Sequence, residues 1–259
     1  MKKLTVLAAG LLLLIPTLSF ADSISLRAGY FMPRALSNSY LSLHPDSLWT
    51  IELDQMSFAP KDYRGGMIGL SYDRFLGPNM SVALTVDGYN KSQVGFYNDW
   101  VLNTLAEGDF AFPYEFYLGD DIVHSFRVGI TPVQLSLKFL PLGRRAKIIP
   151  YVGGGASLVF TSIRMFGDQV NFADPWIYTD PDLGDVDIYP VELLSARETA
   201  TSFGWHAFGG IQVPIGYRAT IEAEARYHAA KARFDNVFVD FDDFEVGGLA
   251  LTLGLSYWF

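Results

Sequence analysis

Charged and imidazole side chains recur at every second position in several segments that otherwise hold small and apolar residues. One such segment, residues 217–229, alternates Glu222, Glu224 and Arg226 with alanines and an isoleucine. In an extended strand, alternate residues share a face, so this segment has one charged and one apolar face. The same parity places a polar network of eight side chains on one side of the predicted sheet: Arg27, Asp87, Arg127, His206, Glu222, Glu224, Arg226 and His228.

A set of acids and bases that shares an enclosed interior has two possible roles. Buried charges require partners, so the first interpretation is a plug of ion pairs. The second is a gated polar path, since rearranged pairs can open a narrow file of water. The sequence leaves both open.

Residues for hydrolysis occur in one acidic and aromatic segment. His124 with Asp120, Asp121 or Asp99 has the composition of an Asp and His surface protease, and the competing interpretation is a hydrated surface. A lipid-modifying enzyme needs Ser, His or Asp beside its lipid face, where this sequence has Ala, Leu, Ile, Val and aromatic residues. We therefore expect no enzymatic activity and no catalytic residues.

A second acidic segment, "TDPDLGDVD", has the composition of a calcium loop. Asp180, Asp182, Asp185 and Asp187 surround Gly184, and closely spaced carboxylates around a glycine turn suit a hard cation such as Ca²⁺. The competing interpretation is a solvated acidic loop. Calcium at the outer loops is the one cofactor that the sequence suggests.

The elements that must position these residues are strands. Alternation predicts eight of them: 23–32, 63–74, 80–89, 125–139, 149–160, 203–213, 217–231 and 245–259. Long connections, 34–62, 91–124, 163–202 and 232–244, alternate with turns of a few residues. An even number of strands joined in this way indicates an all-β fold, an eight-stranded antiparallel transmembrane β-barrel with four long extracellular loops.

One strand breaks the alternation. Apolar residues occupy even positions from Phe126 to Ile130 but odd positions from Val133 to Phe139. A β-bulge at Thr131 and Pro132 would restore one continuous apolar face, and proline is tolerated at a bulge. The sequence therefore predicts a bulge in the middle of this strand.

The two ends of the chain suggest export and assembly. Residues 1–21 combine Lys2 and Lys3, a short apolar run and small residues before Asp22, which is typical of a signal peptide. Residues 22–259 then form the barrel domain, which lacks cysteine and any apolar run of about 20 residues. The last strand, "LALTLGLSYWF", places large apolar residues at every second position, among them Leu253, Leu255, Tyr257 and Phe259.

Parity shows which residues share a face but not which face is inside, and a soluble lipocalin-like barrel is the alternative. Only 18% of residues are charged against 50% hydrophobic, and acidic residues (28 against 19 basic) concentrate in the long connections. Such a chain does not suit nucleic acid. Lipid outside is favoured by two predicted aromatic girdles, formed by Tyr30, Phe160, Phe203, Trp205 and Tyr227 and by Tyr72, Phe75, Tyr217, Tyr257 and Phe259.

Three segments carry a resemblance. "IPYVGGGASLVF", the preceding "ITPVQLSLKF" and the final Tyr257-Trp258-Phe259 resemble strands of the small eight-stranded outer-membrane barrels of Gram-negative bacteria, the OmpA/OmpX/OmpW-like group. The resemblance implies a porin-like monomer in the bacterial outer membrane, with both termini periplasmic and lipid and lipopolysaccharide around it. It also implies that the barrel-assembly machinery recognises the last strand.

Architecture of this kind supports several functions. We expect a structural or surface-interaction role carried by the long acidic outer loops. The alternative is a narrow channel for small or hydrophobic solutes, and a surface or lipid-modifying enzyme is third.

Overall fold

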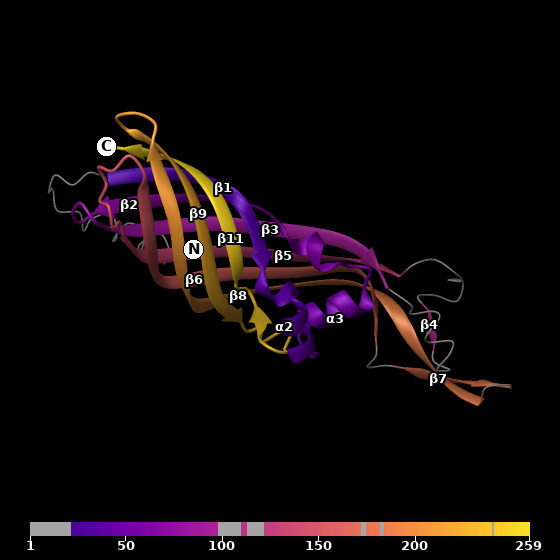
Figure 1. Ribbon diagram of the computed structural model, residues 1–259. Helices are drawn as coiled ribbons and strands as arrows, with labels where there is room; N and C mark the ends of the chain where they lie inside the picture. Colours follow the sequence, from indigo (N-terminus) through magenta and orange to yellow (C-terminus); the bar gives the residue numbers. More distant parts are fainter. Residues whose placement is uncertain (1–21, 98–109, 113–121, 172–174, 182–183, 240) are drawn as a thin grey trace.

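The protein forms a closed antiparallel barrel of eight strands, as predicted. The computed structural model describes residues 22–97, 110–112, 122–171, 175–181, 184–239 and 241–259. Its barrel strands (Figure 1) are β1 (Asp22–Pro33), β2 (Gly65–Phe75), β3 (Met80–Phe96), β5 (Val123–Phe139), β6 (Ile149–Val170), β8 (Gly184–Pro214), β9 (Ala219–Ala232) and β11 (Gly248–Trp258).

Closure depends on the pairing of the last strand with the first. β11 pairs with β1 from Pro33↔Gly248 to Ser23↔Trp258, and with β9 on its other side. Beyond the strand, Phe259 N donates to the carbonyl of Asp22 at 3.0 Å. The apolar edge of the terminal strand is therefore covered by β1, so every barrel strand has two neighbours.

The polarity of the two faces inverts halfway along the strands. In β5, every even residue from His124 to Lys138 is buried, and the odd residues are exposed or intermediate. The buried set changes from Phe126, Val128 and Ile130 to Gln134, Ser136 and Lys138. The register row of Thr131, Phe160 and Thr201 separates a terminal half, polar inside and apolar outside, from an outer half. The outer half is mainly apolar inside, and its outer wall mixes charged and polar residues with exposed apolar ones such as Val94 and Leu193.

The predicted β-bulge at Thr131 and Pro132 is wrong. Val86 pairs with Val133 and Tyr89 with Ile130, which is the same register, and Pro132 opposes Val159 within an unbroken ladder with β6. The apolar residues therefore change face without any slip of the strand.

Two of the connections are more ordered than predicted. The first holds η1 (Arg34–Leu36), α2 (Asn38–Leu43), α3 (Leu48–Gln55) and η2 (Pro60–Tyr63), which lie beside the barrel in Figure 1. The third, predicted as a loop over 163–202, is mainly a continuation of β6 and β8, joined by β7 (Trp176–Asp180). Two short strands, β4 (Phe110–Phe112) and β10 (Phe244–Glu245), pair with β8 and β9.

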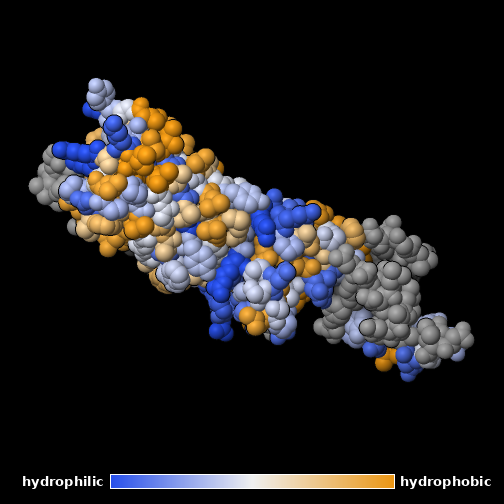
Figure 2. Space-filling model, viewed as in Figure 1, coloured by the Kyte–Doolittle hydropathy of each residue, from blue (hydrophilic) through white to orange (hydrophobic). Residues whose placement is uncertain are grey.

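The outer wall of the terminal half is apolar. Figure 2 shows hydrophobic residues gathered over the barrel and strongly hydrophilic ones beside the helices. Phe203, Trp205 and Tyr217 are exposed as predicted, but Phe75 is wrongly assigned to a girdle: it lies inside, stacked on Trp258 at 4.8 Å. None of the helices within the described residues is long and apolar enough to cross a membrane.

Candidate functional site in the barrel interior

The interior of the terminal half is organised around Glu224. Its Oε1 accepts from Arg27 Nη2 at 2.8 Å and from Arg226 Nε at 2.9 Å, and its Oε2 accepts from the Tyr151 hydroxyl at 3.1 Å. Arg27 Nε also lies 3.5 Å from an Asp87 oxygen. Because all these side chains are buried, each charge depends on its partner rather than on water.

Further polar pairs extend this network around the interior wall. Gln212 Nε2 donates to Glu222 Oε2 at 3.0 Å. The ring of His206 lies between two serines, with Nε2 2.7 Å from Ser136 Oγ and Nδ1 2.8 Å from Ser157 Oγ. The eighth predicted residue, His228, packs edge-on against Phe31 at 5.0 Å, where the polar interior meets the apolar one.

Several members of the network were not predicted from the sequence, among them Asp73, Gln134 and Lys138. Lys138 Nζ lies 2.9 Å from Asp73 Oδ1, both fully buried, and Gln134 accepts a hydrogen bond from Arg226. Parity could have identified them. Asp73 shares a face with Ser71, and Lys138 shares a face with Gln134, and both faces lie opposite the apolar residues of their strands. The ammonium of Lys138 also lies 4.5 Å above the ring of Tyr151.

The predicted interior position of Arg127 is wrong. Arg127 occupies an odd position of β5, is exposed on the outer wall, and donates through Nε to Asn90 Oδ1 at 2.9 Å. The error has the same cause as the predicted bulge, since the polar face turns outward in the outer half.

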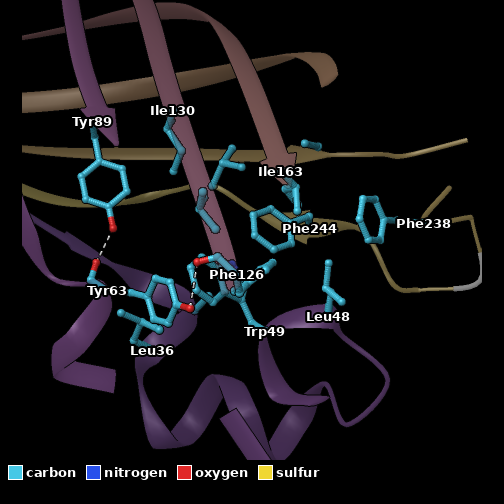
Figure 3. Close-up of a cluster of buried hydrophobic side chains, with 14 of the residues drawn as sticks. Leu36, Leu48, Trp49, Tyr63, Tyr89, Phe126, Ile130, Ile163, Phe238 and Phe244 are labelled. Atoms are coloured by element: carbon cyan, nitrogen blue, oxygen red, sulfur yellow. Dashed lines mark hydrogen bonds between the residues drawn. The ribbon is translucent and has the colours of Figure 1, made fainter. Parts of the chain in front are cut away.

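An apolar cap fills the barrel mouth in the outer half (Figure 3). Trp49 of α3 stacks on Phe244 at 4.9 Å and meets the rings of Tyr63 and Phe126 edge-on. Its indole N donates to the carbonyl of Glu245 at 3.0 Å. We call this cluster the cap; its members include Leu36, Leu48, Trp49, Tyr63, Tyr89, Phe126, Ile130, Ile163, Phe238 and Phe244.

Hydrogen bonds join the cap to the barrel wall. The Tyr63 hydroxyl donates to the carbonyl of Phe126 at 3.2 Å, and the Tyr89 hydroxyl donates to the carbonyl of Tyr63. Burial, with the nearby Glu52 carboxylate, raises the pKa of Tyr63 above its ordinary range, so the phenol stays a neutral donor. The first connection is thus held to two strands across the mouth.

His124 belongs to this closed region rather than to a catalytic rim. Its Nε2 lies 2.9 Å from Glu52 Oε2 of α3, and both side chains are buried. The rings of Tyr97 and Phe58 pack around it. The predicted partners Asp99, Asp120 and Asp121 lie outside the described residues, but an imidazole enclosed in this way is not positioned for a substrate at the surface.

A second carboxylate, Glu198, holds the fourth connection. It accepts hydrogen bonds from the backbone N of Asp235, Asn236, Val237 and Phe238, at 2.9 to 3.1 Å, and from Asn236 Nδ2 at 2.8 Å. Burial by itself raises the pKa of Glu198, but these hydrogen bonds outweigh it and hold the pKa below its usual range. Glu198 therefore stays ionised, and its carboxylate holds the loop that carries Phe238 into the cap.

Of the four proposed calcium ligands, the structure describes the side chains of Asp185 and Asp187. Asp180 and Gly184 form the end of the β7–β8 hairpin, Asp185 accepts from Thr179 Oγ1 at 2.8 Å, and Asp182 lies outside the described residues. Among the described residues, no group of three or more acidic or histidine side chains could hold a metal ion. The calcium site stays a prediction.

The predicted assembly residues lie on the outer wall of β11. Leu253, Leu255, Tyr257 and Phe259 are all more than half exposed. Their inward neighbours Thr252, Gly254 and Ser256 face the polar interior. Their role in assembly is not tested by this placement.

Comparisons with known proteins find similar solved structures. The chain is similar in fold to small outer-membrane barrels. OprG of Pseudomonas aeruginosa matches 93% of this chain over 96% of its own, at 11% identity and a TM-score of 0.46. Ail of Yersinia pestis (13% identity, TM-score 0.40) and outer membrane protein W of E. coli (15% identity, TM-score 0.39) match 93% of this chain over their full lengths. No family model matches, and no curated protein is significantly similar in sequence.

Proposed function

We infer that the chain is an outer-membrane barrel, closed to solutes in this conformation, that anchors an ordered outer platform at the cell surface. The observation that carries this proposal is the inversion of polarity along the strands. An apolar outer wall around a charged interior suits lipid, and an apolar interior within a polar wall suits water. The terminal half therefore lies in the bilayer and the outer half projects beyond it.

Two layers close the interior. At membrane depth, Glu224 forms ion pairs with Arg226 of its own strand and with Arg27 of β1, and beyond them the cap fills the mouth with aromatic side chains. Breaking buried ion pairs costs several kcal/mol, about 3 to 5 when one partner is lost. A barrel built in this way favours display of its outer segments over transport.

The platform consists of the extended β6–β8 hairpin and the helices of the first connection. The two strands of the hairpin have 22 residues in β6 and 31 in β8, more than the roughly 9 to 11 residues that a strand needs to cross a bilayer. The excess supports a surface-interaction role, and the acidic connections would favour basic or cation-bridged partners. No arrangement among the described residues supports catalysis, so we do not assign an enzymatic role.

A narrow channel is the second candidate, because the interior at membrane depth is lined by charged and polar residues. Conductance in planar bilayers separates the two. The purified protein should insert and conduct little, and Trp49→Ala, which loosens only the cap, should leave the ion pairs in place and the conductance low. Large steady conductance in the wild-type protein would reject the platform proposal in favour of the channel.

A further inference from the structure

Three arginines lie side by side on the outer wall. Arg127 of β5 is paired in register with Arg164 of β6, and Arg164 with Arg197 of β8. All three side chains are exposed and face outward. Neighbouring cross-strand Cβ atoms are about 5 Å apart, so the three guanidinium groups form one short row of positive charge.

This arginine row is unusual because the chain around it is acidic. Like charges directly opposite one another on a sheet destabilise it. Within the described part of the chain, no carboxylate lies within ion-pair distance of these guanidinium groups. Arg127 donates to Asn90, Arg164 lies over the ring of Phe166 at 5.6 Å, and Asp168, further along β6, is close to the backbone N of Val123.

The position of the row corresponds to the headgroup layer. It lies four residues beyond the row of Thr131, Phe160 and Thr201, where the apolar wall ends. Four residues span about 13 Å along a strand, or roughly 10 Å along the membrane normal in a barrel with strands tilted by about 40°. Arginine side chains bend toward an interface, which brings the guanidinium groups closer to lipid phosphates.

A groove connects the arginine row to the apolar wall. It has a volume of about 860 Å³, and its lining includes Ile68 and Phe160 below and the three arginines above. Its floor is open because Gly88 and Gly129 lack side chains and Ser162 has a small one. Gly88 is not required by backbone packing, since a Cβ there would have no neighbour closer than 3.8 Å.

We propose that this groove binds one phosphorylated lipid of the outer leaflet, with its phosphate on Arg127, Arg164 and Arg197 and an acyl chain against Ile68 and Phe160. Guanidinium groups bind phosphate through paired hydrogen bonds. A phosphate bound between the three arginines would also offset the repulsion among their positive charges. The groove below gives a lipid an advantage over a free anion. The inference rests on the proposed membrane position of the terminal half.

The test uses the full barrel reconstituted in phosphatidylcholine nanodiscs that contain a minor fraction of lipid A. Native mass spectrometry after release should show one lipid A retained by the wild-type protein. Replacing all three arginines with glutamine should lower retention by about tenfold or more, since charge-assisted contacts to phosphate are lost. A matched variant with Arg145, Lys147 and Arg233 replaced by glutamine, three exposed cations elsewhere, should retain the lipid.

Two further arms separate the sources of binding. Gly88→Leu fills the groove and keeps the arginines, so it should reduce lipid retention without changing the binding of inorganic phosphate. Dephosphorylated lipid A should not be retained. Equal retention of both lipid forms, or equal retention by the arginine variant, would overturn the proposal, and so would full competition by inorganic phosphate.

Membrane insertion is scored separately, by flotation with vesicles and heat-modifiable migration. A protein that fails to insert contradicts the proposed function. A protein that inserts but retains no lipid contradicts only the lipid site.

Discussion

The terminal and outer halves of this barrel use the same strands in the same register with opposite polarity. In β5 the interior side chains are Gln134, Ser136 and Lys138 in one half and Phe126, Val128 and Ile130 in the other. No bulge separates them. The difference teaches that the surroundings of each face, lipid or water, select residue type, whereas backbone pairing stays the same through both regions.

The two halves are also closed in different ways. The terminal half depends on ion pairs and hydrogen bonds between groups that cannot reach water, so its stability is sensitive to the loss of any partner. The outer half depends on aromatic packing contributed by connections, as in a soluble protein. Substitutions that are harmless in one half should therefore be damaging in the other.

The largest expected effect is at Glu224. Glu224→Ala leaves Arg27 and Arg226 without the acceptor they share, and loss of one partner in a buried ionic group costs about 3 to 5 kcal/mol. Urea unfolding in lipid vesicles should show this loss. Glu192→Ala, an exposed acid of the outer half, is the matched control and should change stability by less than about 0.5 kcal/mol. Equal effects of the two variants would contradict the difference between the halves.

The stability loss caused by Trp49→Ala should be similar in size but confined to the first connection. Removing a buried tryptophan costs about 3 to 5 kcal/mol. Because the ladder of strands is independent of α3, the loss should appear as faster proteolysis of residues 34–62, with heat-modifiable migration of the barrel unchanged. Global unfolding of the barrel by this variant would show that the two halves are not separable.

Leu253→Arg tests the outer wall of the terminal half. Leu253 is 66% exposed, and an arginine facing lipid near the bilayer centre costs about 2 to 4 kcal/mol. Folding into vesicles should be impaired. Ser195→Arg, on the outward face of β8 in the outer half, should fold normally. If both variants fold equally well, Leu253 does not face lipid.

The smallest effect is a pH dependence at Glu198. Because its pKa is lowered in the folded state, the stabilisation of the fourth connection is present above the unfolded value of about 4.3 and disappears as the pH falls through the folded value. Proteolysis of residues 233–244 should therefore accelerate in acid in the wild-type protein. Glu198→Gln should show fast proteolysis at neutral pH and a weaker pH dependence, whereas an unchanged profile would remove this role.

Much of the barrel was predictable because alternation is a local property. All eight strands and the interior positions of Arg27, Glu224 and Arg226 follow from parity. Local pattern could not show where the surroundings change from lipid to water, and this led to the errors at Arg127 and Pro132. The cap was also beyond reach, because Trp49 and Phe244 meet only through pairing of distant segments.

The long strands of the outer half were missed for a related reason. Residues 163–202 lack the apolar alternation that lipid demands, so their pattern resembles a loop. Their strand structure depends on pairing between β6 and β8, which continues to Val170↔Val191. Glu198 was likewise counted with the acidic loops, although it is buried by a connection more than thirty residues away.

A cysteine accessibility scan along β8 tests the central claim most directly. The chain has no cysteine, so single cysteines at outward-facing positions 195, 199, 207 and 211 each report one site. In reconstituted vesicles, a membrane-impermeant maleimide should label positions 195 and 199 rapidly and positions 207 and 211 slowly, with all four reacting after unfolding. Rapid labelling at 207 and 211 in the folded protein would contradict a boundary between lipid and water near Phe203.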